Sequence, residues 1–88
     1  MKIRDGFVLR RVMGQPMVIA VGEASRTFSG MIKLNDTGAD LWEWLTEGAT
    51  EEELVARLQQ EYDVDTATAQ NGVKQFVENL RTQGLLAE

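Results

Sequence analysis

The segment from residue 30 to residue 45 most constrains the fold of this chain, because the spacing of its apolar residues changes there from strand-like to helix-like. Residues 31–34 form a short apolar run interrupted by one lysine. Asn35 and Asp36, which belong to the residue types that cap helices well, come next. The apolar residues that follow recur at helical spacing: Leu41, Trp42, Trp44 and Leu45. A strand therefore leads directly into a helix.

The residues before this segment are predicted to form a small sheet. Residues 7–13 are the first strand candidate, and residues 14–16 end it in a turn that holds the only proline of the chain. Residues 17–21 are apolar without alternation, which favours a central strand covered on both faces or paired on both edges. Residues 22–29 are polar enough to form a loop, and residues 30–34 are predicted to form the third strand.

The third strand is expected at the edge of the sheet, because it is short and carries Lys33. Side chains alternate along a strand, so Ile32 and Leu34 share one face and Met31 and Lys33 share the other. An edge strand leaves backbone N–H and C=O groups unpaired, and proteins protect such edges unless the edge has a use. The sequence leaves open whether this strand begins earlier, at the end of the preceding loop.

Three helices are predicted after the sheet, at about residues 36–46, 50–62 and 66–83. Thr50 and Glu53 have the spacing of a capping box, in which each side chain bonds the backbone N–H of the other residue. Gly84 is expected to end the third helix, with Leu85 folding back onto Leu80 as the hydrophobic contact of a Schellman motif. The chain is therefore predicted to be one α+β domain over residues 1–88.

The third helix carries an apolar stripe made of Ala69, Val73, Phe76, Val77 and Leu80. One flank of this stripe holds Gln70, Lys74 and Arg81, and the other holds Gly72, Asn79 and Gln83. The simplest interpretation of the first flank is a solvated face. A glycine in mid-helix costs about 1 kcal/mol relative to alanine, so Gly72 is expected to serve close packing or a bend.

A three-stranded antiparallel sheet followed by three helices is similar to a winged helix-turn-helix domain, and this architecture suggests DNA binding. The charge distribution counts against it, because residues 1–34 carry a net charge of +4 and residues 35–88 a net charge of −9. Phosphate contacts need basic groups on the docking helices. On the third helix, Asp65 and Glu78 balance the two basic residues. A DNA-binding regulator therefore remains only the alternative function.

Catalysis and metal binding are disfavoured by composition. The chain has no cysteine and no histidine, so thiolate and imidazole chemistry are absent. Residues 51–53 are three consecutive glutamates, but the capping box explains them, and Trp42 and Trp44 fit a buried helix face better than a ligand-stacking pair. No apolar run approaches a membrane span of about 20 residues, and no signal-peptide core follows residues 1–5. We expect a cytoplasmic protein that is not an enzyme, holds no cofactor or metal, and binds neither a membrane nor nucleic acid.

Four segments of the chain carry a resemblance to a known family. They are residues 31–42, with the string Leu-Asn-Asp-Thr-Gly-Ala-Asp-Leu-Trp, the helix start at 50–54, the turn at 61–64, and residues 76–86. On these segments the whole chain resembles the PqqD-like family, small proteins that recognise peptides in the biosynthesis of ribosomally synthesised and post-translationally modified peptides. The Leu-Asn-x-Thr-Gly string departs from the member that serves pyrroloquinoline quinone synthesis, which favours a member from another peptide pathway.

The resemblance implies a non-catalytic domain that binds the leader segment of a precursor peptide as an extra strand and delivers it to a modifying enzyme, often a radical S-adenosylmethionine enzyme. It implies that the leader lies along the edge formed by Ser29, Gly30, Met31, Ile32, Lys33 and Leu34. It also implies a groove wall on the third helix, mapped here to Gln70, Val73, Lys74, Val77 and Arg81. The sequence leaves open which flank of that helix faces the third strand.

Overall fold

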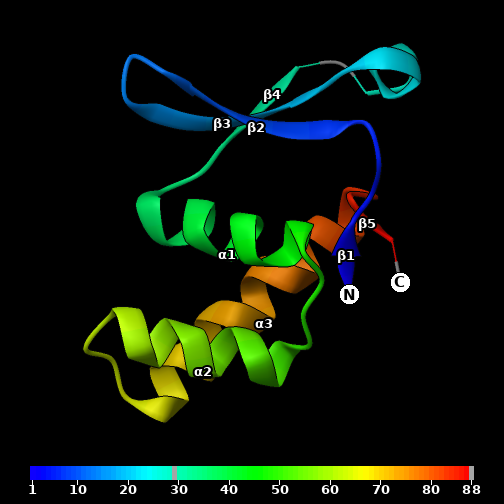
Figure 1. Cartoon of the computed structure of the whole chain (residues 1–88). Helices are drawn as coiled ribbons and strands as arrows, with labels where there is room; N and C mark the ends of the chain where they lie inside the picture. Colours follow the sequence, from blue (N-terminus) through cyan, green and yellow to red (C-terminus); the bar gives the residue numbers. More distant parts are fainter. Residues whose placement is uncertain (29, 88) are drawn as a thin grey trace.

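The computed structural model describes residues 1–28 and 30–87. Its elements, in chain order, are β1 (Lys2–Ile3), β2 (Phe7–Val12), β3 (Gln15–Ala20), the 3₁₀ helix η1 (Gly22–Arg26), β4 (Met31–Lys33), α1 (Asp36–Thr46), α2 (Glu51–Glu61), α3 (Thr66–Thr82) and β5 (Leu86–Ala87). Strands β2, β3 and β4 form an antiparallel sheet in that order. The three α-helices lie on one face of the sheet, with α1 between the sheet and α2 (Figure 1). The α+β fold with the three-stranded sheet first is therefore confirmed.

The turn between β2 and β3 differs from the sequence prediction. The loop has two residues, Met13 and Gly14, with φ angles of 54° and 83°, and two positive φ angles fit the right-handed twist of a tight hairpin. Pro16 was expected in the turn, and that prediction is wrong, because Pro16 lies inside β3 opposite Arg11. Proline lacks a backbone N–H, and Gln15 Nε2 supplies a donor there, 2.7 Å from the carbonyl oxygen of Leu34.

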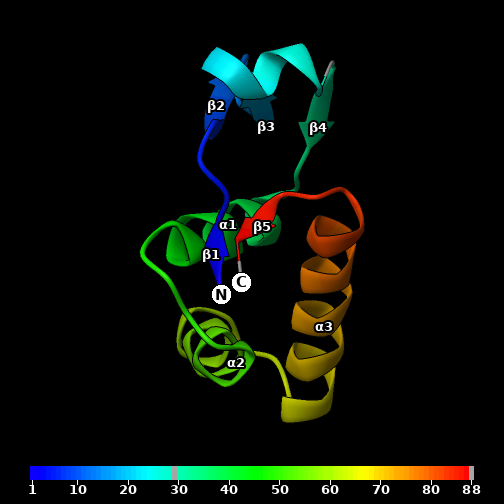
Figure 2. The same ribbon diagram turned by 90° about the vertical axis from the view of Figure 1, so that its right-hand side faces the viewer.

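A second, two-stranded sheet pairs the first and last described strands of the chain. Lys2 lies opposite Ala87 and Ile3 opposite Leu86, and the backbone N–H of Arg4 donates to Leu85 O at 2.9 Å. Figure 2 shows β1 and β5 next to each other beside α1. This sheet could not be predicted from the sequence, because two-residue strands carry too little apolar pattern.

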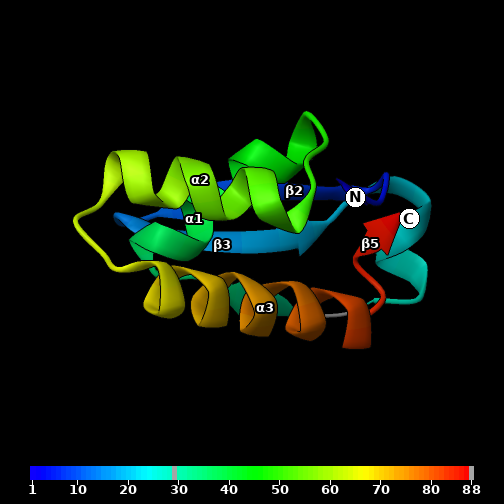
Figure 3. The same ribbon diagram turned by 90° about the horizontal axis from the view of Figure 1, so that it is seen from below.

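One hydrophobic core lies between the sheet and the helices and continues between the helices. Seen from below, α2 and α3 lie side by side in front of the sheet (Figure 3). Its buried members are Ile3, Val18, Leu41, Trp42, Leu45, Leu54, Leu58, Ala69, Val73, Val77, Leu80 and Leu85. Trp42 is almost fully buried, whereas Trp44 is only half-buried and lies under the guanidinium of Arg57, 4.7 Å from the ring centroid. Trp42 is therefore part of the core, and Trp44 stacks with a side chain of the protein itself.

Each α-helix is closed by polar side chains at its N-terminus. Asn35 Oδ1 accepts from the N–H of Gly38 at 2.7 Å. The predicted capping box is confirmed, with distances of 3.1 Å from the Glu53 N–H to Thr50 Oγ1 and 2.9 Å from the Thr50 N–H to Glu53 Oε1. Asp65 accepts from the N–H of Thr68 at 2.7 Å. These caps satisfy N–H groups that no turn of the helix can reach.

The C-terminus of α3 is also closed as predicted. Gly84 has a φ of 76°, the N–H of Leu85 donates to Leu80 O at 2.9 Å, and the N–H of Gly84 donates to Arg81 O at 3.1 Å. These are the two bonds of a Schellman motif, and the buried Leu85 supplies its hydrophobic contact. Across the described residues, no helix combines the length and apolar character needed to cross a membrane.

Candidate functional site

The backbone of β4 forms one free edge of the three-stranded sheet. In the pair of Pro16 and Leu34, the N–H of Leu34 donates to the Pro16 carbonyl oxygen at 3.0 Å. Bonded and non-bonded pairs alternate in an antiparallel ladder, so Ile32 bonds Val18 and directs its backbone groups inward. The N–H and C=O groups of Met31 and Lys33 therefore point outward, away from β3. This edge can accept one more strand.

The side chains of β4 divide between the two faces of the sheet as predicted. Ile32 and the following Leu34 are half-buried and pack against the core. Met31 is 61% exposed and lies on the opposite face, together with Lys33. Gly30 has a φ of 98°, a conformation that favours glycine and turns the chain into the strand. Ser29, which was assigned to the site from sequence, lies outside the described residues.

The sheet has a second free edge at β2. The N–H of Val21 donates to Gly6 O at 2.7 Å, so the same alternation points the backbone groups of Phe7, Leu9 and Arg11 outward. This edge is longer than β4. Edge geometry alone therefore permits strand addition on either side of the sheet, and the surroundings must distinguish the two edges.

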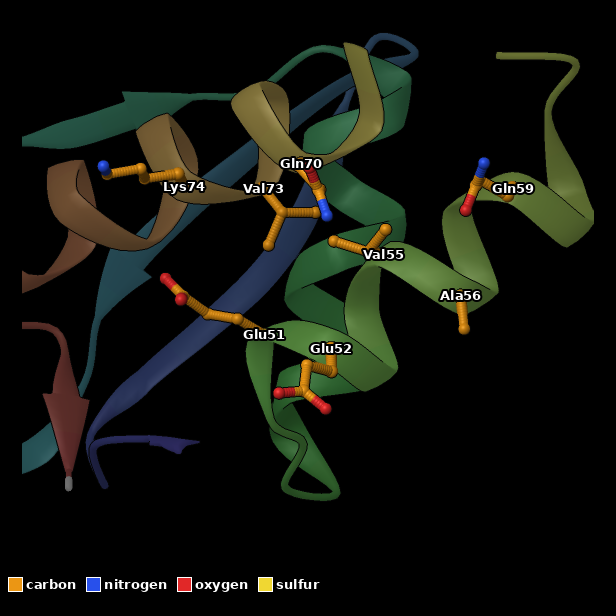
Figure 4. A pocket seen from close by; sticks show the side chains of 8 residues that line it. All are labelled: Glu51, Glu52, Val55, Ala56, Gln59, Gln70, Val73 and Lys74. Atoms are coloured by element: carbon orange, nitrogen blue, oxygen red, sulfur yellow. The ribbon is translucent and has the colours of Figure 1, made fainter. Parts of the chain in front are cut away.

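The structure places the predicted α3 residues beside α2. Gln70, Val73 and Lys74 line a pocket of about 450 Å³ together with residues of α2, among them Glu51 and Val55. In Figure 4, Val55 and Val73 point toward each other, and Lys74 and Glu51 lie on the two sides of the opening. This flank of α3 lies against α2 rather than beside β4.

The two remaining α3 residues of the predicted groove wall lie in different surroundings. Arg81 pairs with Glu78 at 2.5 Å and lines a shallow hollow with Thr50 and Glu51 near the start of α2. Val77 is fully buried in the core, so its side chain supports α3 from within. The structure therefore brings residues 31–34 together as an edge. It places Gln70, Lys74 and Arg81 on the flank of α3 beside α2, and it buries Val73 and Val77 in the core.

The opposite flank of α3 faces the junction of β4 and α1. Gly72, Gln75, Phe76 and Asn79 line a hollow of about 330 Å³ with residues of the start of α1: Asn35, Thr37, Gly38 and Leu41. Figure 2 shows β4 and α3 on the same side of the molecule. The sequence left open which flank of α3 faces β4, and in the structure it is the flank with Gly72, Phe76 and Asn79 that lies toward the end of β4.

Two glycines shape this hollow. A Cβ at Gly38 would lie 3.1 Å from Asn35 Oδ1, so the glycine leaves room for the side chain that caps α1, and Leu34 Cβ and Phe76 Cε1 would lie at ordinary contact distances of 3.5 Å. A Cβ at Gly72 would meet nothing within 4 Å. The expectation that Gly72 serves close packing is therefore wrong, because the glycine leaves open space beside Phe76.

The described residues offer no evident site for a metal ion. Within residues 1–28 and 30–87, no three His, Cys, Asp or Glu side chains gather as metal ligands would. Glu51, Glu52 and Glu53 stand at the exposed first turn of α2, where the capping box holds Glu53. The β4 edge remains as a candidate site whose geometry the structure defines.

The fold and the open edge define a small winged-helix-like domain with a strand available for pairing. Residues 7–86 match the family described as Coenzyme PQQ synthesis protein D (PqqD), and the chain therefore belongs to this family. The match spans both the sheet and the helices. No curated protein matches the chain significantly by sequence.

Two solved structures are similar to the whole chain. One is described as TbiB1 in complex with the TbiA(beta) leader peptide, with 25% sequence identity, a TM-score of 0.76 and coverage of 100% of both chains. The other is described as lasso peptide synthetase B1 complexed with the leader peptide, with 18% identity, a TM-score of 0.76 and coverage of 99% of this chain and 96% of that chain. At 18% identity, the second likeness shows the fold alone.

Proposed function

We propose that this protein binds the leader segment of a ribosomally synthesised precursor peptide and presents the peptide to a modifying enzyme. The observation that carries the proposal is the β4 edge, on which Met31 and Lys33 turn their backbone N–H and C=O groups outward. Membership of the PqqD family supports it, as does the full-length likeness to TbiB1, a protein solved in complex with a leader peptide.

The leader adds to the sheet as a strand beside β4. Main-chain hydrogen bonds supply much of the affinity, and alternate side chains of the peptide supply specificity. On the side of β4 that faces the helices, the bound strand lies next to Leu34 and the α3 flank that carries Phe76 and Asn79. The site consists of residues 30–34 together with this flank.

The protein itself carries out no chemistry in this proposal. It has neither histidine nor cysteine, and the modifying enzyme, for which we propose the radical S-adenosylmethionine class, performs the reaction in the cytoplasm. The alternative of DNA binding has no support from the comparisons, and the helices that would dock on DNA carry most of the negative charge.

The test is a titration of isotope-labelled protein with the cognate leader peptide, followed by backbone amide shifts. The amides of residues 30–34 are expected to shift most, with smaller changes along Gly72, Phe76 and Asn79. Shifts confined to residues 7–12 would place the peptide on the β2 edge. Shifts confined to α2 would contradict strand addition altogether.

A proline variant sharpens this test. In Lys33→Pro, the outward N–H is lost while the bonds to β3 remain, because Lys33 is a non-bonded partner of Met17. Leader affinity is expected to fall about tenfold with little change in folding. The matched variant Lys33→Ala keeps the N–H and should retain most of the affinity. Equal affinity of the proline and alanine variants would show that this N–H does not bind the peptide.

A further inference from the structure

The outer face of the three-stranded sheet is apolar and basic, and no α-helix covers it. Cross-strand pairing arranges its side chains in rows: Val8, Ile19 and Met31 form one row, Arg10, Met17 and Lys33 the next, and Val12 and Gln15 the last. All three α-helices lie on the other face of the sheet (Figure 1). Five of these eight side chains are apolar, although the exposed face of an antiparallel sheet is usually polar.

The composition of this face does not come from the needs of the core. Among the described residues, Val8, Val12, Met17, Ile19 and Met31 do not belong to the set that packs on the core. Val12 is 46% exposed and Met31 is 61% exposed, and Met13 at the hairpin tip is fully exposed. The apolar run of β3 predicted a strand covered on both faces or paired on both edges; β3 is paired on both edges, and the α-helices cover only one of its faces. A partner is the simplest cover for the other.

The charge of the face defines the chemistry of that partner. Arg10 and Lys33 stand at the two ends of the middle row, and the described residues of the three rows include no acid. A second copy docked face to face would bring these like charges together, which disfavours a symmetric dimer through this surface. An apolar surface bordered by carboxylates is complementary to it.

We propose that the outer face of the β2–β3–β4 sheet is the docking surface for an acidic and apolar surface of a partner protein. Naming this partner as the modifying enzyme rests on the proposed function. Met31 and Lys33 connect the two sites, because their backbone groups form the β4 edge and their side chains lie on the outer face. A leader strand bound at the edge therefore extends the docking surface by one strand.

The size of the face predicts that the two binding events are coupled. Three strands of at most six residues present a face of roughly 300 Å², which is well below the roughly 800 Å² that each partner buries in a stable interface. The face alone therefore binds weakly. A fourth strand enlarges it by about one third, so the leader is expected to raise the affinity for the enzyme by about fivefold or more, and the enzyme to raise leader affinity by the same factor.

The experiment measures binding of the purified modifying enzyme, to be identified from the neighbouring genes, with and without the synthetic leader peptide. The test variant is Arg10→Glu with Val12→Glu, both on β2, two strands away from the β4 edge. Enzyme affinity is expected to fall about tenfold or more while leader affinity stays within about twofold of wild type. Lys2→Glu, an exposed charge reversal in the β1–β5 sheet that matches the charge change at Arg10, is the control and should bind both normally.

Several results would overturn the proposal, and each differs from a failure of the proposed function. Unchanged enzyme affinity in the Arg10→Glu, Val12→Glu variant would show that the face does not dock the enzyme. If sedimentation shows that the wild type self-associates and the double variant does not, the face binds a second copy. If the wild type and the Lys2→Glu control bind phosphatidylserine vesicles and the double variant does not, the face binds a membrane. If wild type binds the enzyme through this face but does not bind the leader, only the proposed function fails.

Discussion

The sheet and the helices of this domain differ in how many backbone groups they leave unpaired and how many apolar side chains they leave uncovered. The N-terminus of each α-helix is capped, by Asn35, Thr50 or Asp65, and the apolar faces of the helices meet in one core. The sheet has two free edges and an uncovered apolar face. The helices also carry most of the negative charge, whereas the sheet segment is basic. From this difference we expect the helices to supply most of the stability and the sheet to supply the binding surfaces.

The largest expected effect tests the stability side of this comparison. Leu54 of α2 is fully buried, so Leu54→Ala removes packed methyl groups and is expected to cost about 2–5 kcal/mol in the free energy of unfolding. Met31→Ala changes a residue of the uncovered face and should cost less than about 0.5 kcal/mol. Urea unfolding followed by circular dichroism gives both values. A cost at Met31 equal to that at Leu54 would mean that the outer face is part of the folding core.

A smaller stability effect is expected at the capping box of α2. Thr50→Ala removes the acceptor for the Glu53 N–H, and such changes cost about 1 kcal/mol. Thr50→Ser keeps the hydroxyl and should retain most of the stability. Leader affinity should be unchanged in both variants, because α2 lies on the far side of α1 from the sheet. If Thr50→Ala weakened leader binding as strongly as Lys33→Pro, the helices would contribute to binding as well as to stability.

Much of the fold could be predicted from sequence, because its strongest signals are local. The change of apolar spacing at residues 34–35 marks the step from β4 to α1, and the caps at Thr50 and Gly84 place helix ends by backbone hydrogen bonding. The prediction of a turn at Pro16 was wrong because of a tertiary contact. The Gln15 side chain supplies the donor that a proline cannot, and this bond reaches Leu34, a residue far away in sequence.

The candidate site could be predicted only in part. The edge position of β4 followed from its length and from Lys33, both of which are local properties. The orientation of α3 did not follow, because an apolar stripe has two flanks and its periodicity does not say which neighbour covers each one. Gly38 held no signal for the position of α3, because its tightest neighbour is the capping side chain of Asn35 and its contact with the ring of Phe76 is an ordinary one.

Charge reversal tests the orientation of α3 by binding. If the leader is acidic and lies along β4, Lys33→Glu should weaken its binding severalfold at low salt, and the effect should fade as salt screens an exposed charge. Lys74→Glu should have a smaller effect, because Lys74 lines the pocket beside α2. Titrations at two salt concentrations compare the variants. A stronger loss at Lys74 would favour the groove wall predicted from sequence, with Gln70 and Arg81 beside the peptide.

The smallest expected effect is the pH dependence of one helix cap. Hydrogen bonds from the side chain and the backbone N–H of Thr68 hold the pKa of Asp65 below its ordinary value of 3.8. A carboxyl group with a lowered pKa in the folded state contributes stability that is fully present above the ordinary pKa. This contribution is lost as the pH falls through the pKa of the folded state.

Asp65→Asn separates the cap from its charge. Asparagine also caps helices but does not titrate, so the variant should lose less stability than wild type between about pH 5 and pH 2. Urea midpoints measured across this range give the comparison. Leader affinity at neutral pH should not change, because Asp65 caps the N-terminus of α3, which follows α2 in the chain and is not part of the sheet. An identical acid response in both proteins would mean that the charge of Asp65 does not contribute to the stability of the helical half.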